Sequence, residues 1–273
     1  MRTPIAAGAN TAAPAALSRR LLPAVLVSAS AVLLFGVQIA VAGYAVLVLA
    51  LLLAWFIDRS LFRDLLLIAV GLGIISTISL KANIDYPNMV LFGAVLSAAV
   101  AVPFVIHRRI YRERVIRFPW RGTWPWKRAQ WIYIGVIVVA AIVLLPFYFI
   151  SSGAYQNWPV VHEPDAIARL FVGVNAVGIW DELFFVCIVF TLLCRHFPVW
   201  LANLLQATIF VSFLWELGYQ SWGPLLTIPF ALVQGAIFRM TRSLSYVVTV
   251  HLLFDLVVFL VIVYAHNPGW FGG

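Results

Sequence analysis

Long runs of apolar residues, separated by short polar segments, extend along almost the whole chain. Because a membrane-spanning helix needs about 20 apolar residues, these runs predict a series of spanning helices. The stretch 21–57 carries no formal charge and is too long for one helix, so we expect two short helices there, with a turn near residues 38–40. Further spans are predicted at about 65–80, 89–106, 131–150, 166–194, 199–217, 223–240 and 243–264. The pattern therefore predicts an all-α, polytopic membrane protein with about nine transmembrane helices.

The composition is that of a membrane protein. Of the 273 residues, 64% are hydrophobic and only 10% are charged, whereas soluble domains carry about 25% charged residues. The net charge of +8 does not indicate a nucleic-acid partner, because most Lys and Arg residues lie in short loops, where they set topology and contact lipid headgroups. The expected partner is the lipid bilayer. Residues 1–20 are rich in Ala and Pro and are predicted to form a disordered leader.

Basic residues occur in alternate loops, which predicts the orientation of the chain. The external segments carry Lys81 and almost no other basic residue, and the segment 151–165 holds Glu163 and Asp165. This alternation predicts a cytoplasmic N-terminus and an external C-terminus, in a plasma membrane of the bacterial inner-membrane type. The loop 107–129 mixes Arg with Trp and Phe, so we expect it to lie on the inner leaflet; a docking site for a partner is the alternative. The basic positions predicted to be cytoplasmic are Arg2, Arg19, Arg20, Arg59, Arg63, the loop 107–129, Arg195, Arg239 and Arg242.

Four carboxylates lie inside apolar sequence in the last four spans: Asp181, Glu182, Glu216 and Asp255. His251 precedes Asp255 by four residues, so the two share one helix face. A charge at the bilayer centre costs roughly 2.5–3.5 kcal/mol, whereas an interhelical hydrogen bond in a membrane returns only about 0.6 kcal/mol. We therefore expect the helices to turn these side chains toward one partly hydrated cavity, which is a candidate functional site.

Simpler interpretations stay open for some of these residues. Glu216 lies near the external end of its span and also fits an interfacial residue, and His251 also fits a core histidine bonded to a backbone carbonyl. Asp181 and Glu182 lie about 100° apart on a helix, so one is expected to perform chemistry and the other to orient it. Four amides are expected to form helix–helix hydrogen bonds: Asn175, Asn203, Gln206 and Gln234.

The order of motifs across about residues 165–265 resembles the CPBP group, the CAAX-protease and bacteriocin-processing (Abi) intramembrane proteases. The family pattern is a Glu-Glu-x-x-x-Arg helix, then a Phe-x-x-x-His helix, then a His-x-x-x-Asn/Asp helix. Asp181 and Glu182 fit the first motif, "FVSFLWELG" occupies the second, and His251 with Asp255 fits the third. The closest match is the stretch "LLTIPFALVQGAIFRMTRSLSYVVTVHLLFDLV".

The chain also departs from the family pattern. Asp181 stands in place of the first Glu, and Val186 stands where the family has Arg. Glu216 is the residue that best fits the His position of the second motif, with Ser212 four residues earlier in place of Phe. The resemblance implies two regions, N-terminal transmembrane helices at 21–150 that include the basic loop, and a CPBP-like helical core at 151–273.

The resemblance implies an intramembrane endopeptidase that hydrolyses peptide bonds of a membrane-tethered peptide or prenylated protein. Asp181 or Glu182 would be the general base, Glu216 a water or metal partner, and His251 with Asp255 the oxyanion side. Carboxylates this close share protons or hold a cation. We therefore expect a divalent metal, Zn or Mn, although the chain lacks an H-E-x-x-H motif. The expected metal ligands are Glu182, Glu216, His251 and Asp255.

Two other functions fit the same sequence. The chain could be a catalytically inactive relative that scaffolds or regulates another membrane protein, which the lost Arg and the substituted His favour. It could also conduct protons or cations through the same carboxylates, although the first five spans offer no acidic or basic relay.

Overall fold

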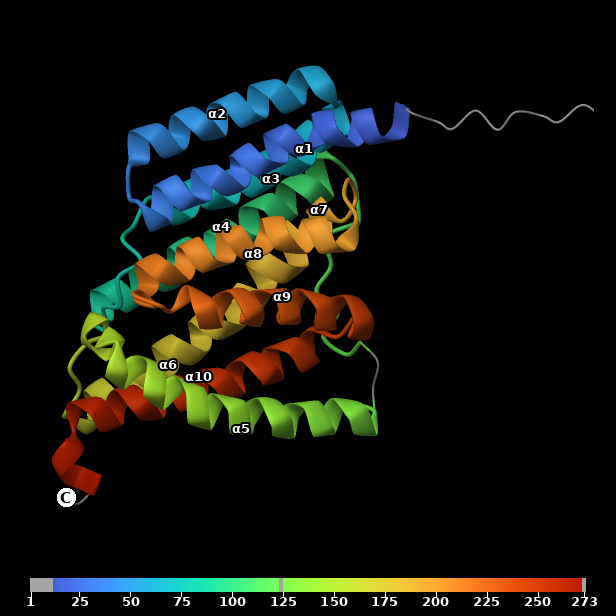
Figure 1. Cartoon of the computed structure of the whole chain (residues 1–273). Coiled ribbons are helices and arrows are strands. Elements are labelled where there is room, and N and C mark those ends of the chain that lie inside the picture. The colour runs from blue at the N-terminus through green and yellow to red at the C-terminus, as the bar shows by residue number, and fades with distance from the viewer. Residues whose placement is uncertain (1–11, 123–124, 272–273) are drawn as a thin grey trace, which may run out of the picture.

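Nine long helices lie side by side in the part of the chain that the computed structural model describes, residues 12–122 and 125–271 (Figure 1). Successive helices run in opposite directions, so their connections alternate between two ends of the bundle. The long helices are α1 (Ala12–Ala31), α2 (Ala40–Ile57), α3 (Arg59–Ile75), α4 (Tyr86–Val105), α5 (Arg128–Ser151), α6 (Pro164–Asp181), α8 (Val199–Leu217), α9 (Pro224–Thr241) and α10 (Leu244–His266). Short helical segments extend or connect them: η1 (Val32–Gly36), η2 (Ile106–Ile110), η3 (Ala154–Asn157), η4 (Glu182–Phe190), α7 (Thr191–Leu193) and η5 (Pro268–Phe271).

This arrangement confirms the predicted all-α, polytopic fold. Eight of the described helices are long and apolar enough to cross a membrane. The ninth long helix, α3, has 17 residues and is not among these eight. The predicted break in the long uncharged stretch is also confirmed, because one helix ends at Gly36 and the next begins at Ala40. The predicted crossing at 166–194 is one continuous helix formed by α6, η4 and α7.

The predicted leader is partly wrong. Helix α1 begins at Ala12, so residues 12–20 are helical; residues 1–11 lie outside the described part of the chain. The segment is rich in Ala and Leu, which have the highest helix propensities. Pro14 falls in the first turn, where a missing N–H donor removes no hydrogen bond of the helix. The helix therefore begins before its apolar stretch, because the residues that precede this stretch have high helix propensity.

The helices differ in how much of their surface other helices cover. In the helix formed by α6, η4 and α7, 72% of the most apolar window is buried, and in α10 the share is 61%. In α2 and α5 it is only 22%. The outer helices therefore present their apolar side chains to lipid, whereas the helices that carry Asp181, Glu182, His251 and Asp255 form the interior.

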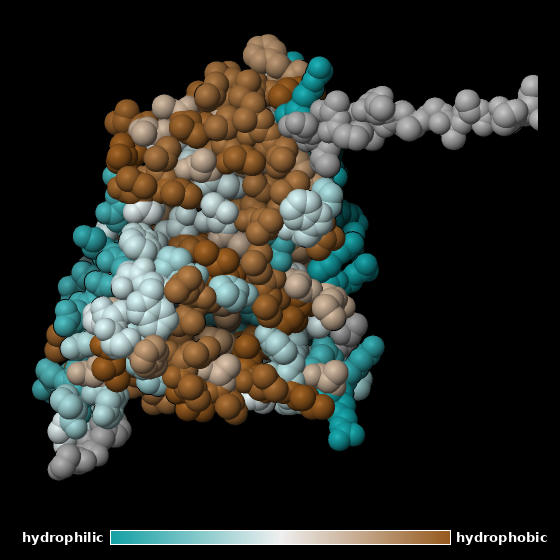
Figure 2. Space-filling view, in the orientation of Figure 1, coloured by the Kyte–Doolittle hydropathy of each residue, from teal (hydrophilic) through white to brown (hydrophobic). Residues whose placement is uncertain are grey.

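The two ends of the bundle differ in charge. Of the seventeen Lys and Arg residues in the described part of the chain, fifteen lie at the end that holds the α2–α3, α4–α5, α7–α8 and α9–α10 connections. We call it the arginine-rich end. The opposite end carries only Lys81 and Arg169 among these residues. In the view of Figure 2, apolar residues cover much of the bundle, and hydrophilic residues gather at the helix ends.

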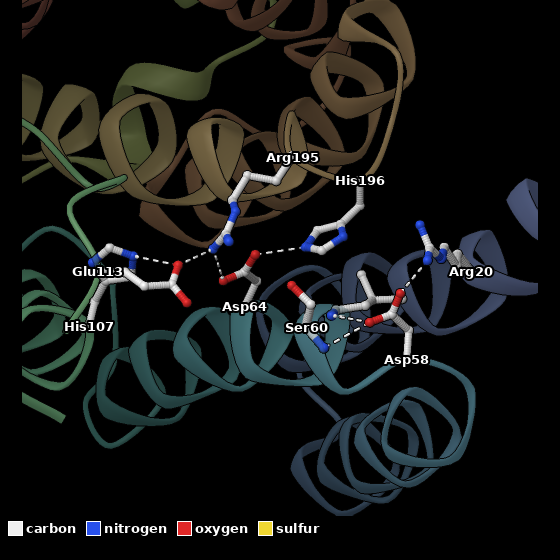
Figure 3. Close-up of polar contacts among 9 residues, drawn as sticks. Arg20, Asp58, Ser60, Asp64, His107, Glu113, Arg195 and His196 are labelled. Carbon is white, nitrogen blue, oxygen red and sulfur yellow. Dashed lines mark hydrogen bonds and ion pairs between the residues drawn. The ribbon is translucent and has the colours of Figure 1, made fainter. Parts of the chain in front are cut away.

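An ion-pair network joins helix α3 to two connections at the arginine-rich end (Figure 3). The buried Asp64 of α3 accepts a hydrogen bond from Arg195 Nη1 at 2.9 Å and lies 2.7 Å from His196 Nε2. Arg195 also contacts Glu113 of the α4–α5 connection at 2.7 Å. Asp64 thereby ties the N-terminal helices to the turn between α7 and α8.

Asp58 forms a second anchor at this end. Its side chain accepts hydrogen bonds from the backbone N–H groups of Ser60 and Leu61 and pairs with Arg20 at 2.5 Å (Figure 3). Burial acts to raise the pKa of Asp58, but these backbone hydrogen bonds and Arg20 together lower it. Asp58 therefore stays ionised as the N-cap of α3 and links that helix to α1.

We expect Asp64→Asn to lower the free energy of unfolding by about 3 kcal/mol, because it removes the negative charge that compensates Arg195 and His196 inside the bundle. Chemical denaturation in detergent micelles measures this loss. Asp85→Asn, which changes an exposed carboxylate at the opposite end, is the control and should stay within about 0.5 kcal/mol of the parent. Equal losses in both variants would show that the network is not what stabilises the bundle.

Candidate active site

Asp181 and Glu182 lie where the helix changes its winding. Helix α6 ends at Asp181, and the π-helical segment η4 begins at Glu182. Wider π-type turns interrupt α-helices mostly at functional sites, because they shift the direction of side chains. Both carboxylates are 2% exposed. The pair therefore lies within the interior of the bundle, on a helix that other helices surround.

The imidazole of His251 bridges the two neighbouring carboxylates. Its Nδ1 lies 2.8 Å from Glu182 Oε1, a hydrogen bond. Its Nε2 lies 3.7 Å from Asp181 Oδ2 and 3.9 Å from Asp255 Oδ1, which are distances of electrostatic contact and not of direct hydrogen bonding. Asp181 and Glu182 therefore reach one imidazole from its two nitrogens, although they point in different directions from their helix. We call these four side chains the buried cluster.

The hydrogen-bond network assigns a tautomer to His251. Gln234 Nε2 donates to the same Glu182 Oε1, so this oxygen is assigned as the acceptor and Nδ1 of His251 as the donor. Nε2 is then directed toward Asp181, Asp255 and the cavity described below. The ring itself packs edge to face against Phe230, with 4.9 Å between the ring centroids. The apolar contact and the Glu182 hydrogen bond together hold the imidazole in one orientation.

Gln234 of α9 belongs to the same network. Its Nε2 donates to Glu182 Oε1 at 2.8 Å and to the carbonyl oxygen of Val247 at 3.1 Å. The sequence predicted helix–helix bonding for this amide, and the bond to Val247 fits that prediction. The sequence does not predict its contact with Glu182, because a buried amide that packs helices and one that supports a carboxylate have the same sequence signature.

Gly178 leaves room for Asp255. A Cβ atom added at Gly178 would lie 1.9 Å from Asp255 Oδ2 and 3.2 Å from His251 Cδ2. No real Cβ atom is found that close to another heavy atom, so any side chain at this position would displace the carboxylate. The absence of a side chain at Gly178 thus allows α10 to pack closely on α6, with Asp255 and His251 against this position.

A cavity of about 280 Å³ ends at the buried cluster. Asp181, His251 and Asp255 line it, whereas Glu182 lies behind His251 and does not. The remaining wall is largely apolar, with residues from α4, α6 and the end of α8 that include Phe92, Leu96, Val174, Val177, Leu214 and Leu217. Three polar side chains therefore face an apolar chamber.

The structure does not bring Glu216 to this cluster. Glu216 lies one residue before the end of α8, and its Oε1 accepts a hydrogen bond from the backbone N–H of Leu80 at 3.0 Å. It lines a separate cavity of about 200 Å³ together with Lys81. Leu214 and Leu217, on either side of Glu216, line the first cavity, so Glu216 projects from another face of α8. The grouping of Glu216 with the other four residues was therefore wrong.

Helix α8 presents apolar residues to the cavity instead. Phe210 contacts the His251 ring at a centroid distance of 6.2 Å, and Leu214, four residues later, lines the cavity. Phe210 and Leu214 thus occupy the Phe-x-x-x-His spacing better than Ser212 and Glu216, with Leu at the His position. Val186 is also buried in the apolar core.

The expected four-ligand metal centre does not fit these residues. Glu216 is bonded to Leu80 and lines the other cavity. Among the described residues, no three His, Cys, Asp or Glu side chains are grouped as metal ligands. The three remaining ligands of the predicted set, Glu182, His251 and Asp255, are arranged around a hydrogen bond and not around a common point.

Residues 163–257 match the family model described as Type II CAAX prenyl endopeptidase Rce1-like. This region is similar to that family. The match begins at the start of α6 and ends beyond Asp255, so it contains every residue of the buried cluster, and it confirms the resemblance to the CAAX-protease group that the motif order predicted. The chain has no significant match among curated proteins or solved structures.

We expect Gly178→Ala to lower by about 100-fold the peptidase activity that the family match suggests, because a displacement of a reacting group by about 1 Å has that order of effect. Gly135→Ala on α5 is the matched control, since a Cβ there meets nothing within 4 Å and the residue does not line the cavity. Both changes raise helix propensity alike. Cleavage of a lipid-tethered reporter peptide in proteoliposomes provides the measurement, and a similar effect of the two variants would contradict the close approach of Asp255.

Proposed function

We propose that this protein is an intramembrane endopeptidase that hydrolyses a peptide bond of a membrane-tethered substrate. The observation that supports it most is the cluster of Asp181, His251 and Asp255 at the inner end of an apolar cavity, with Glu182 bonded to His251 from behind. The Rce1-like match agrees with this reaction class. Burial of ionisable groups in a bilayer is costly and is typical of functional sites.

Asp181 is the proposed general base. One of its carboxylate oxygens, Oδ1, is buried without a hydrogen-bond partner, and the residue lines the cavity. A water molecule in the cavity would donate a proton to Asp181 while its oxygen attacks the substrate carbonyl carbon. The protonated Asp181 would then return this proton to the leaving amine as the carbon–nitrogen bond breaks.

His251 and Glu182 are proposed to serve the developing oxyanion. A doubly protonated imidazole would donate to Glu182 through Nδ1 and to the oxyanion through Nε2. Asp255, with its Oδ1 3.9 Å from Nε2, would favour this charged imidazole. Glu182 takes the orienting role that a buried carboxylate has beside a catalytic histidine. Substrate access fits this arrangement, because Val172 of α6 lines the cavity and is also 56% exposed at the lipid-facing surface.

A catalytically silent scaffold is the second candidate. It is favoured by Leu214 and Val186, which are apolar where the family pattern places His and Arg. Such a protein would bind a tethered peptide in the same cavity without cleaving it. Equilibrium binding of the reporter peptide to the parent protein, with intact peptide recovered afterwards, would favour this function.

We expect Asp181→Asn and His251→Ala each to lower the cleavage rate by 100-fold or more, while the variants remain folded in detergent. Glu182→Gln should act through His251 and have a smaller effect, because an amide can still accept from Nδ1. The cleavage rate in proteoliposomes and the melting temperature of each variant decide the matter. Unchanged cleavage per folded molecule in Asp181→Asn would exclude Asp181 as the base.

A further inference from the structure

The outer part of the cavity lies at one end of the bundle, and Val172 of α6 also lines the cavity from the lipid-facing side. Its outer wall is formed by residues 81–84 of the α3–α4 connection, by Trp158 of the α5–α6 connection and by Tyr219 after α8. All three segments lie at the end opposite the arginine-rich end. From Arg169, which bonds this outer wall, to Asp181 the helix rises about 18 Å. The cavity therefore leads from this surface to the middle of the bundle.

The path from the buried cluster toward the arginine-rich end is filled by apolar side chains. Cys187, Leu244 and Val247 are 0% exposed and form one packed cluster with Val248. Three of these four residues belong to the first turns of α10, between His251 and the arginine-rich end. Phe118 of the α4–α5 connection packs against them from outside. This apolar plug separates the site from the basic connections.

Two hydrogen bonds fix the wall at the open end. Glu216 of α8 accepts from the backbone N–H of Leu80 at 3.0 Å, and Arg169 of α6 donates to the carbonyl oxygen of Ile84 at 2.6 Å. The α3–α4 connection is thus held from both sides of the opening. Glu216 thereby has a structural role at the mouth of the cavity, although it is absent from the buried cluster.

The charge of the two ends relates this opening to the membrane. Cytoplasmic connections of membrane proteins carry an excess of Lys and Arg. Fifteen of the seventeen described basic residues lie at the arginine-rich end, which the plug separates from the site. The cavity opens at the other end, where Lys81 and Arg169 are the only Lys or Arg residues in the described part of the chain.

We infer that the cavity opens to the extracytoplasmic face of the membrane, and that its substrate is a peptide segment tethered at or emerging from the outer leaflet. The inference about the substrate depends on the proposed endopeptidase function, whereas the orientation does not. A peptide tethered at the cytoplasmic face would meet the apolar plug and the arginine-rich connections. The site would therefore act on proteins after their export across the membrane.

Single cysteines test the orientation without any need for activity. Asn83→Cys places a thiol at the mouth, and Arg114→Cys places one at an exposed position of the arginine-rich end. Both are made in a Cys194→Ser background that keeps Cys187, which is fully buried; this background alone is the blank. Labelling with a membrane-impermeant maleimide is measured in spheroplasts of a bacterial host and again after solubilisation, which gives the total reactive thiol.

We expect Asn83→Cys to be labelled in intact spheroplasts and Arg114→Cys only after solubilisation. Labelling of Arg114→Cys in spheroplasts, or protection of Asn83→Cys there, would overturn the inference. In a second experiment, a bulky maleimide on Asn83→Cys should lower cleavage of the reporter peptide at least tenfold, and the same reagent on Arg114→Cys should not. Unchanged cleavage after complete labelling at residue 83 would refute this route to the site. If the parent cleaves no reporter while the labelling has the expected pattern, the endopeptidase proposal fails and the orientation stands.

Discussion

A carboxylate in the middle of a membrane-spanning helix is stable only where protein groups replace the water that it has lost. Glu182 satisfies this constraint through one oxygen, which receives hydrogen bonds from Gln234 of α9 and His251 of α10. The two donors come from two other helices, so the carboxylate fixes three helices relative to one another. The geometry of the site is therefore a consequence of how this single charge is accommodated.

The same constraint explains which helices lie inside the bundle. The helix that carries Asp181 and Glu182 is the most buried of the candidate spans, because any face of it turned to lipid would bring the carboxylates closer to hydrocarbon. Gly178 then allows α10 to approach closely enough for Asp255 and His251 to lie against α6. The outer helices α2 and α5 need no such fit and present apolar side chains to lipid. Close helix packing is therefore required around the buried carboxylates and not at the lipid-facing helices.

Periodicity made much of this arrangement predictable. The apolar runs predicted the helices, and the four-residue spacing of His251 and Asp255 placed both on the cavity side of α10. The position of Glu216 could not be predicted, because an apolar run sets the length of a helix but not which face of the helix turns toward the site. Gln234 could not be assigned to the site either, since only the tertiary structure shows that its amide reaches Glu182. The early start of α1 came from helix propensity, which hydropathy does not measure.

Val186 and Leu214 stand where the family pattern has Arg and His. The positive charge of the site must therefore come from another residue. An Arg on the helix of the acidic pair would provide it locally, but Val186 is apolar, and Leu214 gives α8 no polar contact with the cavity. The imidazole of His251 is then the one group of the buried cluster that can carry positive charge, and Gln234 adds a neutral donor. Both belong to helices that follow the acidic pair in sequence by about 50 residues or more. The acidic pair is therefore compensated only after α9 and α10 have packed against it, which couples formation of the site to completion of the bundle.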